Sequence, residues 1–435
     1  MTSTAPVPAV PLRQAQPRVL RLWLFRGTAL LLAWLVIELC AVGALLLLGD
    51  WRILRELQRG IALSGAPRNS PQEVIHPYVG WVTNPDFPSS QECCGKPAGV
   101  NELGLLDTGP SVYQRSPERL IVGICGGSVA WQFSYCAEER LRAGLQQISQ
   151  FSDREIVIVR LAAPGYKQPQ GLQLLTYLFS LGGEFDVLIN LDGFNEIVLP
   201  ILENIPSEIT PAYPRMWHLR MLDVVDPSDF ALAERLRLIR SQRQAAAHWG
   251  YHHPCGRLPS AQLFWFLMDQ TRHYELVRLQ AELTAGKTAR GTTFLQRGPR
   301  QPTWPAEEVL RESADIWERC SLQMHRLCVA NDITYLHFLQ PNQYVPGSKP
   351  LSEFEFERCY WEDSPVRRTV ADGYPLLLER VLNLQAAAVN CWDLTQAFSN
   401  TRETLYVDPW CHFNAAGNLI LAEAVIDQLQ AVLDR

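Results

Sequence analysis

The first long hydrophobic segment of the chain runs from Gly27 to Leu48 and contains a single charged residue, Glu38. A helix of this length reaches about 33 Å, which matches the hydrocarbon core of a bilayer. A buried core helix would show the same pattern, but the Arg-bearing leader before this segment favours the membrane. A cleaved signal peptide has a shorter apolar region of about 7–15 residues. We therefore predict a leader at 1–26 and a transmembrane helix at 27–49.

The charges around this segment indicate its orientation. Four arginines precede it without an acidic residue among them, whereas the three that follow are accompanied by Asp50 and Glu56. Basic residues gather on the cytoplasmic side of membrane anchors, so we expect the leader in the cytoplasm and the rest of the chain outside it. The arginines are Arg13, Arg18, Arg21 and Arg26 before the segment and Arg52, Arg55 and Arg59 after it.

Glu38 lies near the middle of the predicted span. A carboxylate at that depth costs about 2.5–3.5 kcal/mol on insertion scales. Either a second helix pairs with it, or the surrounding leucines outweigh its cost. We favour the second interpretation.

From residue 119 onward, short apolar runs alternate with segments of helical spacing. Such alternation predicts a parallel sheet covered by helices on both faces. The first strands are predicted at Leu120–Cys125, Glu155–Leu161 and Asp186–Asn190, with helices at 137–148 and 168–181. After the helix at 305–330, the predicted elements are strand Thr334–Leu339, helix 374–386, strand Ala388–Leu394 and the amphipathic final helix Ala415–Leu433.

This alternation breaks between about residues 197 and 305, where prolines are followed by helical patterns around 228–248 and 259–284. We interpret this segment as a helical insertion into a domain at 119–435. Its tryptophans could line a sugar or acyl-chain site, although core packing is favoured for each. They are Trp217, Trp249, Trp265 and Trp304.

Residues 50–118 separate the predicted span from this domain. They are expected to form a juxtamembrane helix at Trp51–Arg59, a linker at 60–75 and an irregular lead-in packed on the domain.

The composition supports a folded domain and excludes a nucleic-acid partner. Of the 435 residues, 47% are hydrophobic and 19% charged, which is typical of a chain with a substantial core. The net charge of −6 lacks the basic footprint of nucleic-acid binding. The chain has no Asn-x-Ser/Thr sequon, which favours a bacterial exported domain over a eukaryotic secreted one.

The eleven cysteines leave the redox compartment open. Cys93 and Cys94 are adjacent in a polar segment and are expected to be redox-active or bridged to distant partners. Cys125 and Cys411 are expected to be small core fillers instead.

Ser128 is the first candidate for chemistry. It follows Gly126 and Gly127 at the end of the first predicted strand and can begin the next helix. A serine hydroxyl becomes a nucleophile when an adjacent base, usually His oriented by a carboxylate, activates it. In doubly wound sheets such groups gather at the carboxyl ends of strands. A plain helix cap is the alternative interpretation of Ser128.

Three further segments fit the same chemistry. Gly165 lies in Ala162–Tyr166 after the second strand, and Asn195 follows the third strand. Backbone N–H groups and Asn side chains can stabilise an oxyanion in the transition state. His412 lies just before the final helix, four residues after Asp408. Each segment alone could be an ordinary loop, but their placement after successive strands favours one shared site.

Together these segments resemble the conserved blocks of the SGNH (GDSL-like) hydrolases, a family of serine esterases, lipases and acyltransferases. The resemblance covers roughly residues 119–196 and 334–435. It implies a flavodoxin-like three-layer α/β sandwich with a parallel sheet. It also implies a catalytic triad of Ser128, His412 and Asp408. The implied oxyanion donors are the N–H groups of Ser128 and Gly165 and the side chain of Asn195.

The chain departs from the family pattern at three places. Gly-Gly-Ser-Val at 126–129 replaces Gly-Asp-Ser-Leu, and Glu196 stands where the family has Asp. Asp408 precedes His412 by four residues, whereas the family's acid usually precedes it by three. Pro409 can introduce a bulge that restores the reach, and Glu196 is the first alternative carboxylate.

These features predict a single-pass, membrane-anchored serine esterase in a bacterial cell membrane, with its catalytic domain outside the cytoplasm. The expected substrate is an ester, such as an O-acyl group on a cell-envelope carbohydrate. The alternatives are an O-acyltransferase on envelope polysaccharide and a non-catalytic polysaccharide-binding or assembly module. No organic cofactor or metal is expected, since the segment 252–255 (His-His-Pro-Cys) lacks a second ligand pair at zinc spacing.

Overall fold

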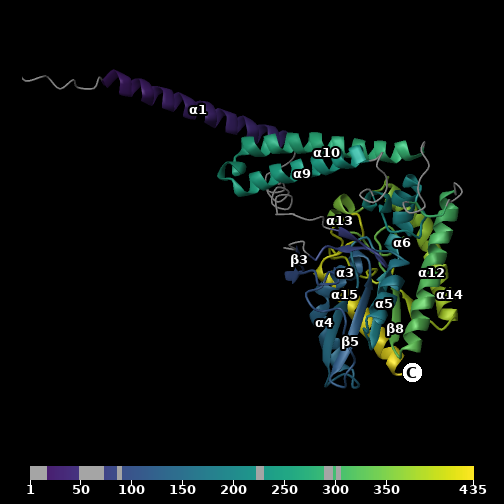
Figure 1. The fold of residues 1–435 in the computed structure, drawn as a ribbon. Coiled ribbons are helices and arrows are strands. Elements are labelled where there is room, and N and C mark those ends of the chain that lie inside the picture. Colours follow the sequence, from purple (N-terminus) through teal and green to yellow (C-terminus); the bar gives the residue numbers. More distant parts are fainter. Residues whose placement is uncertain (1–16, 49–72, 86–90, 222–229, 289–296, 300–304) are drawn as a thin grey trace, which may run out of the picture. The chain divides into compact units, whose positions relative to one another are not determined.

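The computed structural model describes residues 17–48, 73–85, 91–221, 230–288, 297–299 and 305–435 (Figure 1). The chain divides into two compact units. The first unit joins the N-terminal part of the chain, up to Pro67, to residues 234–282. The second unit contains residues 68–233 and 283–435. The predicted juxtamembrane helix at Trp51–Arg59 lies outside the described residues.

The described residues of the first unit form three long α-helices and one short 3-10 helix. Helix α1 (Pro17–Leu48) begins ten residues before the predicted span, and its part from Arg21 to Leu48 is long and apolar enough to cross a membrane. Helices α9 (Phe230–His252) and α10 (Pro259–Thr288) form an antiparallel hairpin, joined by the short helix η3 (Pro254–Arg257). Ion pairs cross from α9 to α10 at Arg243–Asp269 and Arg235–Glu275.

Two of our interpretations of the first unit are wrong. Glu38 is not left to the surrounding leucines, because Ser260 at the start of α10 hydrogen-bonds both of its carboxylate oxygens. A partner 222 residues away in the sequence could not be identified from the apolar pattern of α1. Trp249 of α9 is exposed and does not pack in a core.

The second unit is built on a five-stranded parallel sheet. The strands lie in the order β6-β5-β7-β8-β9, so the chain order of the sheet is 2-1-3-4-5. Arg119 of β5 pairs with Glu155 of β6, and Val187 of β7 pairs with Thr334 of β8. The bounds are β5 (Arg119–Gly126), β6 (Glu155–Arg160), β7 (Val187–Asp192), β8 (Thr334–Leu339) and β9 (Cys391–Asp393).

Helices cover both faces of this sheet (Figure 1). One face carries α3 (Ser128–Cys136), α4 (Glu138–Gln147) and α15 (Ala415–Leu433). The other carries α5 (Gln170–Ser180), α6 (Phe194–Leu199), α12 (Ala306–Ala330) and α14 (Pro365–Ala386). The predicted parallel sheet with two covered faces is therefore confirmed.

Shorter elements complete the second unit. The predicted irregular lead-in contains two small antiparallel hairpins, so the prediction of irregular structure there was wrong in part. Their strands are β1 (Glu73–His76), β2 (Gly80–Thr83), β3 (Gln91–Cys93) and β4 (Lys96–Ala98). The short helices are η1 (Pro200–Asn204), η2 (Ile205–Ser207), α7 (Trp217–Arg220) and α13 (Glu353–Arg358).

Sequence patterns located some elements better than others. The bounds of β8 and α15 match the predicted ones, because both elements end at clear polar or turn residues. Helix α14 begins nine residues before its predicted start, since Ser364 caps it through the N–H of Arg367. Pro375 inside this helix obscured the pattern.

Candidate active site

Ser128 is the first residue of α3 and directly follows the turn that leaves β5. The first N–H groups of a helix have no partner within it, so the Ser128 N–H is free to bind an incoming group. The β5 strand lies between β6 and β7, where the strand order of the sheet reverses. In doubly wound sheets ligands bind at this reversal point, beyond the carboxyl ends of the strands.

The two glycines before Ser128 permit this sharp turn. Gly126 has φ +139°, and a Cβ there would lie 2.1 Å from the carbonyl oxygen of Leu191. A Cβ on Gly127 would lie 2.3 Å from the side-chain nitrogen of Asn195. Any larger residue at Gly127 would therefore displace Asn195.

His412 and Asp408 lie on one tight loop between β9 and α15. The loop is closed by an antiparallel bridge between Tyr406 and Phe413 and by a hydrogen bond from the Val407 N–H to the His412 carbonyl. Cys411 within it adopts a left-handed conformation with φ +64°. This turn brings residues four apart into contact, so the unusual spacing does not separate acid from imidazole.

The structure brings Ser128, His412 and Asp408 into one hydrogen-bonded array. The His412 Nδ1 lies 2.6 Å from Asp408 Oδ2, and its Nε2 lies 2.6 Å from Ser128 Oγ. The other Asp408 oxygen accepts a hydrogen bond of 2.8 Å from the Trp410 N–H, which fixes the carboxylate. The imidazole is thus oriented by the acid and directed at the serine, as a general base must be.

The predicted oxyanion residues meet beside this array. The Asn195 side-chain N–H donates a 2.8 Å hydrogen bond to the Tyr166 carbonyl, so Asn195 is held against the loop that carries Gly165. Gly165 has φ +87°, a conformation that favours glycine. Asn195 is the second residue of α6 and lies close to Gly127, next to Ser128.

Glu196 links two loops of the site, a structural role that the sequence did not reveal. It is buried, and its two oxygens accept hydrogen bonds from the Gly193 N–H (2.8 Å) and the Gln168 N–H (3.0 Å). One carboxyl group therefore joins the loops of Asn195 and Gly165. Glu196 is not the carboxylate on His412, since that position belongs to Asp408. In the sequence, the only indication that Glu196 belongs to the site was its position directly after Asn195.

Burial and the nearby Asp192 raise the pKa of Glu196 to about 8, although hydrogen bonds from Gly193 and Gln168 act in the opposite direction.

Arg215 forms a wall beside Gly165. A Cβ on Gly165 would lie 2.5 Å from the Cδ of Arg215. Glu203 holds the guanidinium through two hydrogen bonds of 3.0 and 2.6 Å.

Two other loops are linked by an aromatic pair. The rings of Trp410 and Phe194 pack edge to face, with their centroids 6.4 Å apart. Trp410 is partly exposed at this side of the site.

A disulfide anchors the far end of the helix that Ser128 begins. Cys136, the last residue of α3, is bonded to Cys94 between β3 and β4, with a Cα–Cα distance of 5.3 Å. The expectation that this cysteine pair includes a bridged residue is confirmed for Cys94. Cys125 and Cys411 are free and buried, as expected of core fillers.

Among the described residues, one cluster has the ligand types for a metal ion, namely Cys93, Cys94 and Cys136. Two of its three sulfurs form the disulfide, so the cluster does not fit a metal.

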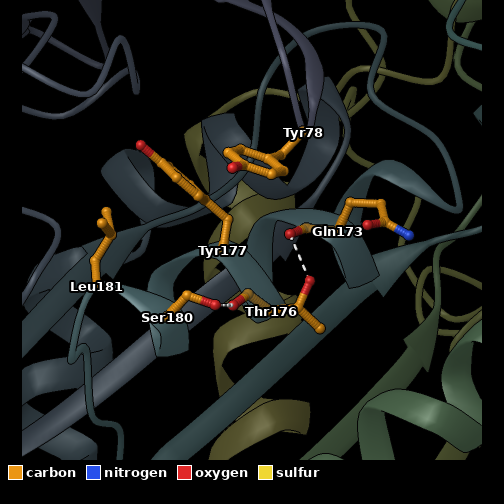
Figure 2. Close-up of a pocket in the computed structure, with 6 residues that line it drawn as sticks. All are labelled: Tyr78, Gln173, Thr176, Tyr177, Ser180 and Leu181. Atoms are coloured by element: carbon orange, nitrogen blue, oxygen red, sulfur yellow. Dashed lines mark hydrogen bonds between the residues drawn. The ribbon is translucent and has the colours of Figure 1, made fainter.

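A surface pocket of about 240 Å³ lies apart from these residues (Figure 2). Tyr78 stacks on Tyr177 beside it, with ring centroids 5.4 Å apart. The hydroxyls of Thr176 and Ser180 bind carbonyls within α5 and so are not directed at a ligand. None of the lining residues belongs to the Ser128 site; they are Tyr78, Gln173, Thr176, Tyr177, Ser180 and Leu181.

A second Ser–His–Asp array is buried in the core. The His337 Nε2 lies 2.8 Å from Asp192 Oδ1, and its Nδ1 lies 2.7 Å from Ser321 Oγ. Burial by itself lowers the pKa of His337, but Cys391 and Asp192 together raise it above the ordinary value. His337 is therefore charged and paired with Asp192 inside the core.

No protein-family model matches the chain, and no curated protein matches it. Among solved structures, the crystal structure of an acetyl xylan esterase is similar, with 11% sequence identity and a TM-score of 0.31. The match covers 72% of this chain and 98% of that chain. A likeness this weak establishes neither a shared fold nor a shared activity, so the chemistry of the site rests on its own geometry.

Proposed function

We propose that the protein is a membrane-anchored serine esterase of the SGNH type that hydrolyses an O-acyl ester on a cell-envelope carbohydrate. The observation that carries this proposal is the array Ser128–His412–Asp408, with both imidazole contacts at 2.6 Å. The sheet order 2-1-3-4-5 agrees with the flavodoxin-like fold that the family resemblance implies.

In the proposed reaction, Ser128 Oγ attacks the ester carbonyl carbon while His412 Nε2 takes the serine proton. The carbonyl oxygen becomes an oxyanion, stabilised by the N–H groups of Ser128 and Gly165 and the Asn195 amide. His412 then returns the proton to the alcohol oxygen as the carbon–oxygen bond breaks, leaving an acyl-serine. Water attacks the acyl carbon of this intermediate while His412 Nε2 takes a proton from the water. The bond between the acyl carbon and Ser128 Oγ then breaks, His412 returns the proton to Oγ, and the acid leaves. Asp408 stabilises the imidazolium in both halves.

The departures from the family motif have physical reasons in this chain. The space that an Asp side chain would need at Gly127 is occupied by the Asn195 amide. The longer Asp408–His412 spacing is compensated by the left-handed turn at Cys411. Both explanations support the proposed family assignment, although the chain lacks the family's usual residues at these positions.

The membrane-anchored location is supported by two features. Helix α1 is long and apolar enough to span a bilayer. The Cys94–Cys136 disulfide belongs to an oxidising compartment, which agrees with a catalytic unit outside the cytoplasm. We therefore propose a single-pass protein of a bacterial cell membrane.

A carbohydrate acceptor for the acyl group is the second candidate function. The partly exposed ring of Trp410 and the Arg215 guanidinium flank the site, and both residue types bind sugars. A sugar hydroxyl seated there would replace water in the second half-reaction, giving an O-acyltransferase.

The proposal is tested with the full-length protein in detergent. A fluorophosphonate probe should label the wild type and Ser321→Ala but not Ser128→Ala. Failure to label any well-folded form would favour a non-catalytic polysaccharide-binding module. Released acid and acylated polysaccharide are then measured together with an acetylated donor. Excess release identifies an esterase, and excess transfer identifies an acyltransferase.

A further inference from the structure

Glu38 forms a specific contact with the hairpin of α9 and α10. Its Oε1 accepts a 2.6 Å hydrogen bond from the Ser260 hydroxyl, and its Oε2 accepts a 2.9 Å bond from the Ser260 N–H. Ser260 is the second residue of α10, so the carboxylate also faces the positive end of a 30-residue helix. Ala41 and Leu45 are buried on the same side of α1 as Glu38.

This contact determines how deep the start of α10 lies in the membrane if α1 spans it. Glu38 is 11 residues from Gly27 and ten from Leu48, or about 15 Å from either end of the apolar segment. Half of a bilayer's hydrocarbon core is also about 15 Å. If α1 spans the bilayer, Ser260 therefore lies near the midplane, and the start of α10 must enter the membrane with it.

The hairpin has the composition that this depth requires. Between Arg243 and Asp269, the 25 residues include no Lys, Asp or Glu and a single Arg, Arg257. Charged residues resume at the Arg243–Asp269 ion pair, which joins α9 to α10 through bonds of 2.6 and 2.8 Å. This pair lies nine residues beyond Ser260 along α10, or about 14 Å. The part of the hairpin between this ion pair and its tip, where Arg257 is the only Lys, Arg, Asp or Glu, is thus about as long as half a bilayer.

The side chains of this part also suit lipid. Several large apolar residues point outward and would meet water if the hairpin stood outside the membrane. They are Trp249, Tyr251, Phe264 and Leu267. The helices satisfy their own backbone hydrogen bonds, which a membrane-inserted segment must do. The polar tip residues His252, His253 and Arg257 oppose insertion, but they are few beside the apolar ones.

A hairpin in water would instead require residues 38–48 of α1 to leave the membrane with it. That arrangement would expose Leu39, which is 70% accessible, and Leu47, which is 91% accessible, to solvent. It would also shorten the apolar span to Gly27–Ile37, about 16 Å, too short to cross a bilayer.

We infer that residues 244–268 form a re-entrant hairpin, which enters the hydrocarbon core from the non-cytoplasmic side and packs on α1 at Glu38. Its partner is the bilayer interior itself. This inference rests on the proposed membrane span and not on the esterase activity.

The test uses thiol accessibility in the full-length protein in native membranes. Cys40 and Cys255 are exposed and are replaced by Ala; the other described free thiols are buried. Single cysteines are then introduced by Phe264→Cys and by the matched control Tyr274→Cys. These aromatic residues are 67% and 73% exposed on the same helix, ten residues apart. A membrane-impermeant maleimide should label Phe264→Cys about tenfold more slowly than Tyr274→Cys, because thiolate and reagent are excluded from hydrocarbon.

Equal labelling of the two positions would overturn the inference. Carbonate extraction separates this failure from a failure of the span: a protein released by carbonate has no span, whereas a retained protein with equal labelling lacks only the re-entrant hairpin. If Phe264→Cys misfolds, Tyr251→Cys on α9 serves in its place. A disulfide formed between Glu38→Cys and Ser260→Cys independently supports their contact, and its absence under oxidation contradicts it.

Discussion

The described residues of the second unit contain two Ser–His–Asp arrays. Their hydrogen bonds have similar lengths, but the arrays differ in exposure and in the imidazole nitrogen that faces the serine. In the loop array, the side chains of His412 and Asp408 are 19% and 34% exposed, and the serine faces the imidazole Nε2. In the core array, the side chains of His337 and Asp192 are 0% and 3% exposed, and the serine faces Nδ1.

The difference teaches that short hydrogen bonds do not by themselves define a reactive triad. The core array is buried, and Asp192 and Cys391 raise the pKa of its histidine although burial by itself lowers it. It stabilises the sheet between β7 and β8. The loop array borders the reversal point of the sheet, where Asn195 and Gly165 also meet.

The largest effect should come from replacing the serine of each array by alanine and comparing the two variants. Ser128→Ala should reduce ester hydrolysis by about ten-thousandfold or more, since residual oxyanion stabilisation alone remains. Ser321→Ala should leave the rate within about twofold, because a buried hydroxyl does not touch the substrate. Initial rates with a short acyl ester measure both. Comparable losses in the two variants would erase the distinction between the arrays.

The two aspartates should separate activity from stability. Asp408→Asn should keep the fold and lower kcat by about a hundredfold or more, because the amide favours the wrong imidazole tautomer. Asp192→Asn should instead lower the free energy of unfolding by about 3–5 kcal/mol, because it leaves the buried His337 charge unpaired. Rates and denaturant melts on both variants check this contrast. A stable Asp192→Asn protein with a large loss of rate would reverse our assignment.

Glu196 tests how firmly the loop array depends on its surroundings. Glu196→Gln should lower kcat by about tenfold with little change in KM, because an amide has one acceptor oxygen for the two N–H groups of Gly193 and Gln168. Such a loss would mark Glu196 as a positioning residue. Unchanged kcat in this variant would mean that the two loops hold their place without it.

The same residue should give a pH signature in stability. The pKa of Glu196 is raised from 4.5 to about 8 by burial and by Asp192. Between these values the folded protein retains a proton that the unfolded chain has released, so stability should fall as pH rises through this window. Glu196→Gln should flatten that part of the curve, as measured by the melting temperature from pH 5 to 8. Parallel curves for the two proteins would contradict the raised pKa.

The smallest effect on rate is expected from the disulfide. Cys94→Ser should destabilise the unit by about 2–4 kcal/mol, since the bridge closes a loop of about 40 residues, while kcat stays near that of the wild type. Thermal melts and rates below the transition measure the two quantities. A large loss of rate at unchanged stability would show that the anchor of α3 acts on Ser128 directly.

The sequence allowed us to predict those site residues that lie in short local motifs. Ser128, Gly165, Asn195 and His412 could be found because each follows a strand or precedes a helix in a short motif. The fixed three-residue spacing failed as a guide to Asp408, since the left-handed turn at Cys411 depends on the fold of the loop. Their catalytic roles stay predictions.

Contacts between distant segments could not be predicted. Ser260 reaches Glu38 across 222 residues, and Cys136 reaches Cys94 across 42. Nothing in either pair's local pattern identifies the other member, because only the folded chain brings them together. Glu196 shows the same limit at short range: its neighbours in sequence were visible, whereas its hydrogen bond to Gln168 depends on how two loops pack.

The positions of the proposed nucleophile and base along the chain determine the order in which they are synthesised. Ser128 and His412 are 284 residues apart, and the hairpin of α9 and α10 lies between them. At ordinary rates of synthesis the ribosome needs tens of seconds to pass from one to the other. Ser128 therefore emerges long before His412. If the two act as proposed, the nascent protein cannot cleave an ester until His412 has been made, and by then the residues of the first unit have already been synthesised.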